Sequence, residues 1–154
     1  MPRNFGGLYK HKVDAKGRVS LPARLRRVVE GNGAGEEVVM VMSDDQTHML
    51  AFLESELDRR LEIMQSSDDP SALPTSRRDP RRASMFGRSS SSQIDSAGRI
   101  ALYKPYMKKC AIEKECVFEG MGDFFIIYEP ARYEAMMQEE IAGFSLHEEL
   151  GLAA

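Results

Sequence analysis

Hydrophobic positions alternate with polar ones in some segments of this chain and recur every three or four residues in others. The order of these segments in the first half is repeated in the second half. In the first half, short alternating or wholly apolar runs predict strands, and apolar residues three or four positions apart predict helices. Ser55 stands where a side-chain oxygen would cap a helix beginning at Glu56, and the glycine-rich residues 31–35 end an earlier helix. The predicted elements are strands at 9–13 and 19–21, a helix at 23–29, strands at 37–42 and 48–53, and a helix at 56–64.

The second half repeats this order of elements. Its predicted elements are strands at 92–94 and 99–102, a helix at 105–110, strands at 115–119 and 124–128, and a helix at 130–140. Residues 66–88 between the halves are polar, proline-broken and then basic, which is typical of a linker; the arginines within 77–82 are either a phosphate-binding arm or part of a solvated connection. The pattern predicts a mainly β protein with short helices (α+β). Its units are 5–65 and 89–140, and its tail at 141–154 is a frayed or partner-dependent helix.

One short motif occurs in both halves. Residues 14–22 read Asp-Ala-Lys-Gly-Arg-Val-Ser-Leu-Pro, and residues 95–103 read Asp-Ser-Ala-Gly-Arg-Ile-Ala-Leu-Tyr. The glycine permits a positive φ in a tight turn, and the aspartate can accept backbone N–H groups or pair with the arginine. The arginine then projects from a stiff turn, where its planar fork can bind guanine or phosphate. A single copy would favour an ordinary turn with an arginine resting on its own aspartate, but two copies favour a binding function.

The distribution of charge supports a polyanionic partner, although the net charge is −3. Residues 1–30 hold eight Lys and Arg against two acids, and residues 77–109 hold nine against two. Positive charge therefore surrounds the two motif copies, while the remainder of the chain is acidic. A polyanion responds to the local field within about 8 Å at physiological salt rather than to the net charge. The alternative is a solvated basic face that has no partner.

The sequence argues against an enzyme, a metal site and a membrane protein. It shows no nucleophile with a motif base, no phosphate-binding glycine loop and no outstanding pair of carboxylates, so we expect neither catalysis nor a cofactor. Cys110 and Cys116 are interpreted as small buried hydrophobes, and the three histidines fit no metal pattern. The chain has no apolar run long enough for a membrane span and no signal-peptide core at its start, so we expect a cytoplasmic protein.

The doubled motif and the order of elements resemble the MraZ family of bacterial transcriptional regulators over residues 5–138. The resemblance implies SpoVT/AbrB-like swapped-hairpin modules at 5–65 and 89–140 that pair within one chain into a double-split β-barrel. It also implies multi-subunit rings that bind tandem short repeats in promoter DNA. Their target is the division and cell-wall gene cluster, including the regulator's own gene, and we expect repression at the nucleoid.

The resemblance assigns roles by position. Arg18 matches the family's DNA-contacting arginine, and Arg99 is its equivalent in the second half. The turn-shaping residues are Asp14, Gly17, Asp95 and Gly98, and the expected phosphate-binding neighbours are Lys16, Arg24 and Arg26. The chain departs from the family where Tyr103 replaces the usual proline and Pro105 stands at the position equivalent to Arg24, so the second half is expected to serve packing more than DNA contact.

Two other classes of function compete with a regulator. One is an AbrB- or MazE-like antitoxin, and the other is a structural, ring-forming assembly protein whose Gly-Arg turns hold subunits together. Antitoxins of this type usually have one module and a disordered toxin-binding tail, whereas this chain has two predicted modules and a short tail. That difference favours the regulator.

Overall fold

The computed structural model describes residues 4–32, 36–66, 89–143 and 145–151, and it confirms the predicted α+β class. The elements of the first half are β1 (Leu8–Lys12), β2 (Arg18–Ser20), α1 (Ala23–Glu30), β3 (Glu37–Met42), β4 (Met49–Leu53) and α2 (Glu54–Ser66). Those of the second half are β5 (Ser89–Gln93), β6 (Arg99–Ala101), α4 (Lys104–Lys109), β7 (Glu115–Gly120), β8 (Phe125–Tyr128), α5 (Pro130–Gly143) and α6 (Leu146–Glu149). The predicted 66–88 linker, with its arginines, lies outside the described residues apart from Ser66.

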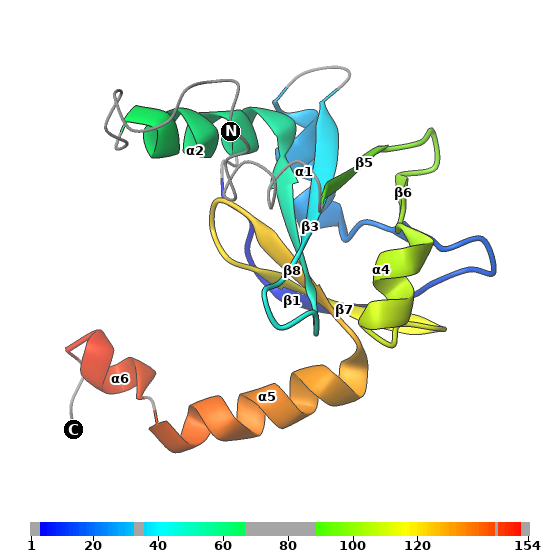
Figure 1. Cartoon of the computed structure of the whole chain (residues 1–154). Coiled ribbons are helices and arrows are strands. Elements are labelled where there is room, and N and C mark those ends of the chain that lie inside the picture. Colours follow the sequence, from blue (N-terminus) through cyan, green and yellow to red (C-terminus); the bar gives the residue numbers. More distant parts are fainter. Residues whose placement is uncertain (1–3, 33–35, 67–88, 144, 152–154) are drawn as a thin grey trace.

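Strands from the two halves interleave in one antiparallel sheet (Figure 1). Its order is β1-β7-β8-β4-β3-β5, so each half's hairpin, β3–β4 or β7–β8, lies at the centre. The first strand of each half pairs with the hairpin of the other half: β1 pairs with β7, and β5 pairs with β3. The two remaining strands, β2 and β6, form a separate two-stranded ribbon across the halves. Neither half therefore completes its own sheet.

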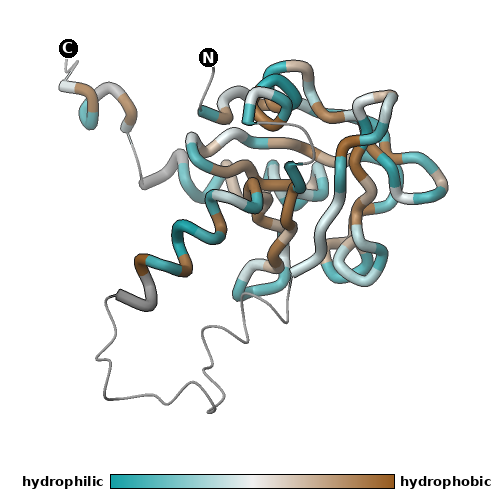
Figure 2. The backbone as a smooth tube through the Cα atoms, turned by 90° about the horizontal axis from the view of Figure 1, so that it is seen from above, coloured by the Kyte–Doolittle hydropathy of each residue, from teal (hydrophilic) through white to brown (hydrophobic). Residues whose placement is uncertain are grey.

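The sheet is covered on both faces. The main core joins one face of the sheet to the β2–β6 ribbon and to helices α1 and α4, and Phe118 and Phe125 are fully buried within it. On the other face, α2 packs through Leu57 and Leu61, and α5 packs through Tyr133. Figure 2 shows hydrophobic segments concentrated in the body and hydrophilic segments in its outer loops. The ribbon is thereby fixed on the core.

The structure corrects two details of the predicted elements. Helix α2 begins at Glu54, so the prediction that Ser55 caps it is wrong. Ser55 instead donates from its backbone N–H and its hydroxyl to the Glu36 carboxylate, at 3.1 and 3.0 Å. Strand β5 begins at Ser89 rather than at residue 92, because pairing with β3 stabilises a serine run that has no hydrophobic alternation of its own.

Both cysteines are fully buried, unbridged thiols, which confirms their interpretation as small hydrophobes. Burial raises the pKa of Cys110 to about 11 and that of Cys116 to about 12. Within the described ranges, no three His, Cys, Asp or Glu side chains gather as metal ligands. In the described part of the chain, none of the helices is long and apolar enough to cross a membrane.

Candidate nucleic-acid interface

The first motif copy forms a tight turn between β1 and β2. Asp14 Oδ1 accepts the backbone N–H groups of Lys16 and Arg18 at 2.9 and 2.8 Å, and Asp14 Oδ2 accepts Arg18 Nε at 2.9 Å. Gly17 has a φ of +82°, which the turn requires and which glycine adopts without steric cost. The Arg18 backbone N–H is the main cause that lowers the pKa of Asp14 below its ordinary value. This carboxylate is therefore charged at neutral pH and holds both the turn and its arginine.

The second copy, between β5 and β6, has the same geometry. Asp95 Oδ1 accepts the N–H groups of Ala97 and Arg99 at 2.9 Å each, and Asp95 Oδ2 accepts Arg99 Nε at 3.0 Å. Gly98 has a φ of +79°. The pKa of Asp95 is lowered, first by the Arg99 backbone N–H. In both turns the aspartate binds the backbone and the arginine at the same time, although the sequence left these as alternatives.

The two turns are joined across the β2–β6 ribbon. The Leu102 N–H donates to the Gly17 carbonyl at 2.8 Å, and the Leu21 N–H donates to the Gly98 carbonyl at 3.0 Å. Between these bonds, Val19 pairs with Ile100, and both side chains are buried. Side chains alternate between the two faces of a strand, so the residues flanking this buried pair lie on the outer face.

Arg18 and Arg99 lie on that outer face, with 36% and 33% of their side chains exposed. Each arginine is tied to its aspartate through Nε. That bond leaves the two terminal Nη nitrogens for another acceptor, while the guanidinium is held in position. Two oriented arginine forks on one ribbon can bind phosphate oxygens or the acceptor edge of guanine.

The other predicted site residues lie at different places around the ribbon. Lys16 is exposed within the first turn. Arg26 extends from α1 to the second turn, where its guanidinium covers Gly98, and its Nε donates to Glu30 at 2.6 Å. Arg24 packs against Gly6 near the N-terminal end of β1. The first-half helix therefore supplies a basic neighbour to the second-half turn, an exchange that spacing along the chain does not reveal.

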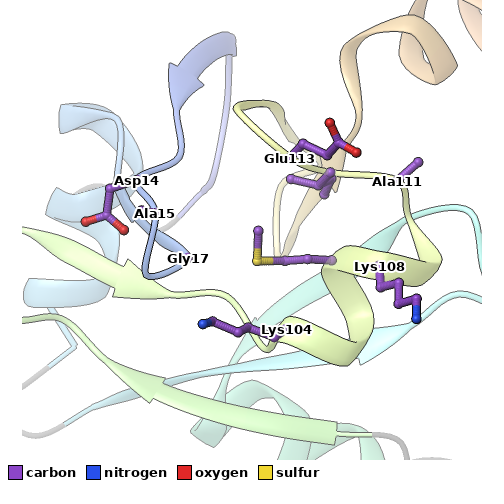
Figure 3. Close-up of a pocket in the computed structure, with 9 residues that line it drawn as sticks. Asp14, Ala15, Gly17, Lys104, Lys108, Ala111 and Glu113 are labelled. Carbon is purple, nitrogen blue, oxygen red and sulfur yellow. The ribbon is translucent and has the colours of Figure 1, made fainter.

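A hollow of about 520 Å³ lies beside the first turn, and sequence reasoning did not identify it. It is lined by Asp14, Ala15, Gly17, Lys104, Met107, Lys108, Ala111, Ile112 and Glu113. Figure 3 shows Lys104 extending from α4 toward the turn that contains Gly17. These lysines belong to the basic segment noted in the sequence, but only the pairing of β2 with β6 brings α4 next to the first motif copy.

Gly17→Ala is expected to destabilise the protein by about 2 kcal/mol. Alanine would be strained at the positive φ of this position, and its Cβ would also crowd neighbouring atoms. A Cβ at Gly17 would lie 3.2 Å from Met107 Sδ and 3.3 Å from the Leu102 carbonyl. The matched control is Gly122→Ala, since Gly122 has a similar φ of +87° but nothing within 4 Å of the added Cβ. Strain alone should cost the control about 1 kcal/mol. Urea unfolding measures the free energy of unfolding of both variants. Equal decreases in the two variants would show that crowding at the turn has no effect.

Comparisons with known proteins agree with the resemblance noted in the sequence. The family model of the MraZ protein, which is also described as antitoxin-like, matches residues 4–48 and 85–152. The transcriptional regulator MraZ of Ruegeria pomeroyi is 35% identical over 148 residues, which cover 92% of this chain and 85% of that protein. The MraZ regulator of Pelagibacter ubique is 32% identical over 84% of this chain and 81% of its own length. The MraZ regulator of Parvibaculum lavamentivorans is 31% identical over 92% of this chain and 87% of its own length.

Proposed function

Because this chain belongs to the MraZ family, a family of transcriptional regulators rather than enzymes, we propose that it binds double-stranded DNA sequence-specifically through the outer face of the β2–β6 ribbon. The observation that carries this proposal is the pair of Asp-held arginines, Arg18 and Arg99, presented on one ribbon. Lys16 in the first turn and Lys104 on α4 add positive charge beside them. Basic side chains supply most of the affinity for DNA, and oriented arginines supply base recognition.

The proposed architecture is a double-split β-barrel made of two AbrB-like modules, 5–65 and 89–140. Two reciprocal features support it: β1 pairs with β7 as β5 pairs with β3, and the turns exchange hydrogen bonds through Gly17 and Gly98. In this arrangement one chain supplies both halves of a pseudo-symmetric DNA-binding ribbon. The ribbon can then bind DNA only when both halves are folded together.

Within this ribbon, Arg18 is the principal contact and Arg99 the secondary one. The anchoring of Nε to an aspartate fixes each guanidinium before DNA arrives, which lowers the entropic cost of binding. Lys16 and Arg26 lie in or beside the turns and bind phosphates, and Arg24 extends the basic surface along α1. Asp14, Gly17, Asp95 and Gly98 shape the turns.

The protein acts as a multi-subunit ring on tandem promoter repeats. Helices α5 and α6 extend away from the body (Figure 1), and Leu146 and Leu150 are 57% and 61% exposed. Such apolar side chains on a projecting arm suit contact with a neighbouring copy. A ring that engages several repeats gains about 10²–10⁴-fold in affinity over one weak site. Its target is the division and cell-wall gene cluster, including its own gene, which it represses in the cytoplasm at the nucleoid.

A mobility-shift titration tests this function. The purified protein is expected to shift the DNA upstream of its own gene more tightly than a scrambled sequence. The logarithm of the affinity should decrease linearly with the logarithm of the salt concentration, with a slope of about −0.9 per phosphate neutralised. If the assembly neutralises about six to ten phosphates, the affinity should fall by about 10³–10⁵-fold between 50 and 200 mM salt. The absence of a shift, from a protein that still elutes as a large assembly, would indicate an assembly or toxin-neutralising role instead.

A further inference from the structure

An exposed aromatic residue lies on the same face of the ribbon as the two arginines. From Arg99 onward the burial alternates: Ile100 and Leu102 are buried, whereas Ala101 and Tyr103 are exposed. The alternation places Tyr103 on the outer face, with 46% of its surface exposed. It therefore shares the proposed DNA-binding face without being part of either motif turn.

The strand register brings Tyr103 to the first turn, although it belongs to the second half of the chain. Ala101 is opposite Arg18, and the Leu102 N–H donates to the Gly17 carbonyl. Tyr103 follows Leu102 directly and therefore lies beside the first turn, which also carries Lys16. Lys104, which follows Tyr103, lies beside the same turn. Tyr103 and Lys104 from the second half therefore lie beside the turn that carries Lys16 and Arg18 in the first half.

The position of Tyr103 is well defined by its neighbours. Its carbonyl accepts the N–H groups of Tyr106 and Met107 at 3.0 Å each and so begins α4. Its ring packs edge-on against that of Tyr106, with centroids 4.9 Å apart and planes at 88°, and Tyr106 is itself buried. An exposed ring held in this way loses little conformational entropy when its hydroxyl binds a ligand.

The two ends of the ribbon differ at this point. The residue equivalent to Tyr103 in the first half is Pro22, which precedes α1 with a φ of −51°, close to the −69° of Tyr103. Pro22 lies at the end of the second turn, where Ala97 stands in place of Lys16. A hydroxyl donor and flanking lysines are therefore found together at the first-turn end.

We propose that Tyr103 is an additional DNA-contact residue whose hydroxyl donates a hydrogen bond to a backbone phosphate beside the Arg18 turn. The inference rests on the proposed DNA-binding function and deepens it. Tyrosine hydroxyls are among the side-chain groups that bind phosphate and position a protein on the duplex. Lys104 supplies charge next to it, so the two residues extend the first-turn contact with groups of different chemistry.

Two substitutions of Tyr103 and one of its neighbour test the proposal by mobility shift. Tyr103→Phe keeps the ring and removes the hydroxyl, and Tyr103→Pro restores the residue of the first half at a φ that proline adopts. Both are expected to weaken binding about tenfold, equally on cognate and scrambled DNA, without changing the salt slope, because the contact is neutral and reads no base. Lys104→Gln should instead reduce the steepness of the salt slope by about 0.9 for each subunit that contacts the DNA.

The outcomes separate this inference from the proposed function. Wild-type affinity in Tyr103→Phe would overturn the hydroxyl contact while leaving the regulator in place. Weaker binding accompanied by a smaller assembly in sedimentation would also overturn it, since Tyr103 would then contact another copy of the chain. If the wild-type protein shifts neither DNA, the proposed function and this inference fail together.

Discussion

Replacing Arg18 with alanine is expected to lower the affinity for operator DNA by at least about 100-fold. An arginine fork bound to a base or a phosphate pair is worth about 1–3 kcal/mol for each copy. An assembly that engages several repeats loses that amount at several sites at once, so the loss is multiplied. The measurement is a mobility shift on the upstream DNA, at the salt concentration where the wild-type protein binds specifically.

The fold should survive this substitution. Asp14 Oδ1 still accepts the backbone N–H groups of residues 16 and 18, which hold the turn without the guanidinium. The side chain of Arg18 is 36% exposed, so its removal leaves no cavity in the core. We therefore expect an unchanged unfolding transition and an unchanged sedimentation coefficient.

Two other arginines are compared with Arg18, one as a weaker DNA contact and one as a control. Arg99 has the same turn geometry but lies at the other end of the ribbon, where Ala97 replaces a lysine, so Arg99→Ala should weaken binding less. Arg59 on α2 pairs with Glu56, and α2 covers the opposite face of the sheet, so Arg59→Ala should leave binding within about twofold of wild type. Wild-type binding by Arg18→Ala would contradict its role, and an equal loss in Arg59→Ala would indicate a general charge effect.

Phe118→Ala is expected to destabilise the protein by about 3–5 kcal/mol, out of a typical total of about 5–15 kcal/mol. Phe118 is 0% exposed, and its ring meets those of His11 on β1 and Phe125 on β8, with centroids 5.7 and 5.9 Å apart. It stands where the first strand of one half joins the hairpin of the other. A cavity here weakens the contact that makes the two halves one folding unit.

Urea unfolding measures this loss, and Leu8→Ala is the control. Leu8 also lies on β1 but is 53% exposed, so its truncation should cost less than about 0.5 kcal/mol. Because Phe118 is in the core rather than on the outer face of the ribbon, the folded variant should keep wild-type affinity for DNA. A loss below about 1 kcal/mol would mean that β1 contributes little to the joint core.

Features that depend on neighbours a few residues apart can be predicted from the amino-acid sequence alone. Aspartate and arginine four positions apart, with glycine between them, specify both turns, because every bond within each turn is local. The order of strands and helices and the membership of the MraZ family also followed from the sequence. Helix α1, for example, buries Leu25, Val28 and Val29 at the spacing of a helical face.

Contacts between distant segments, in contrast, become visible only in the folded chain. The serine run of β5 carries no hydrophobic period and becomes a strand because β3 supplies its hydrogen-bond partners. Arg26 covers Gly98, and Tyr103 reaches the first turn, because β2 pairs with β6 across the two halves. Periodicity and propensity report what a segment can form. Its partner depends on long-range pairing that must offset the entropy of closing the intervening chain, and that balance is set by the whole core.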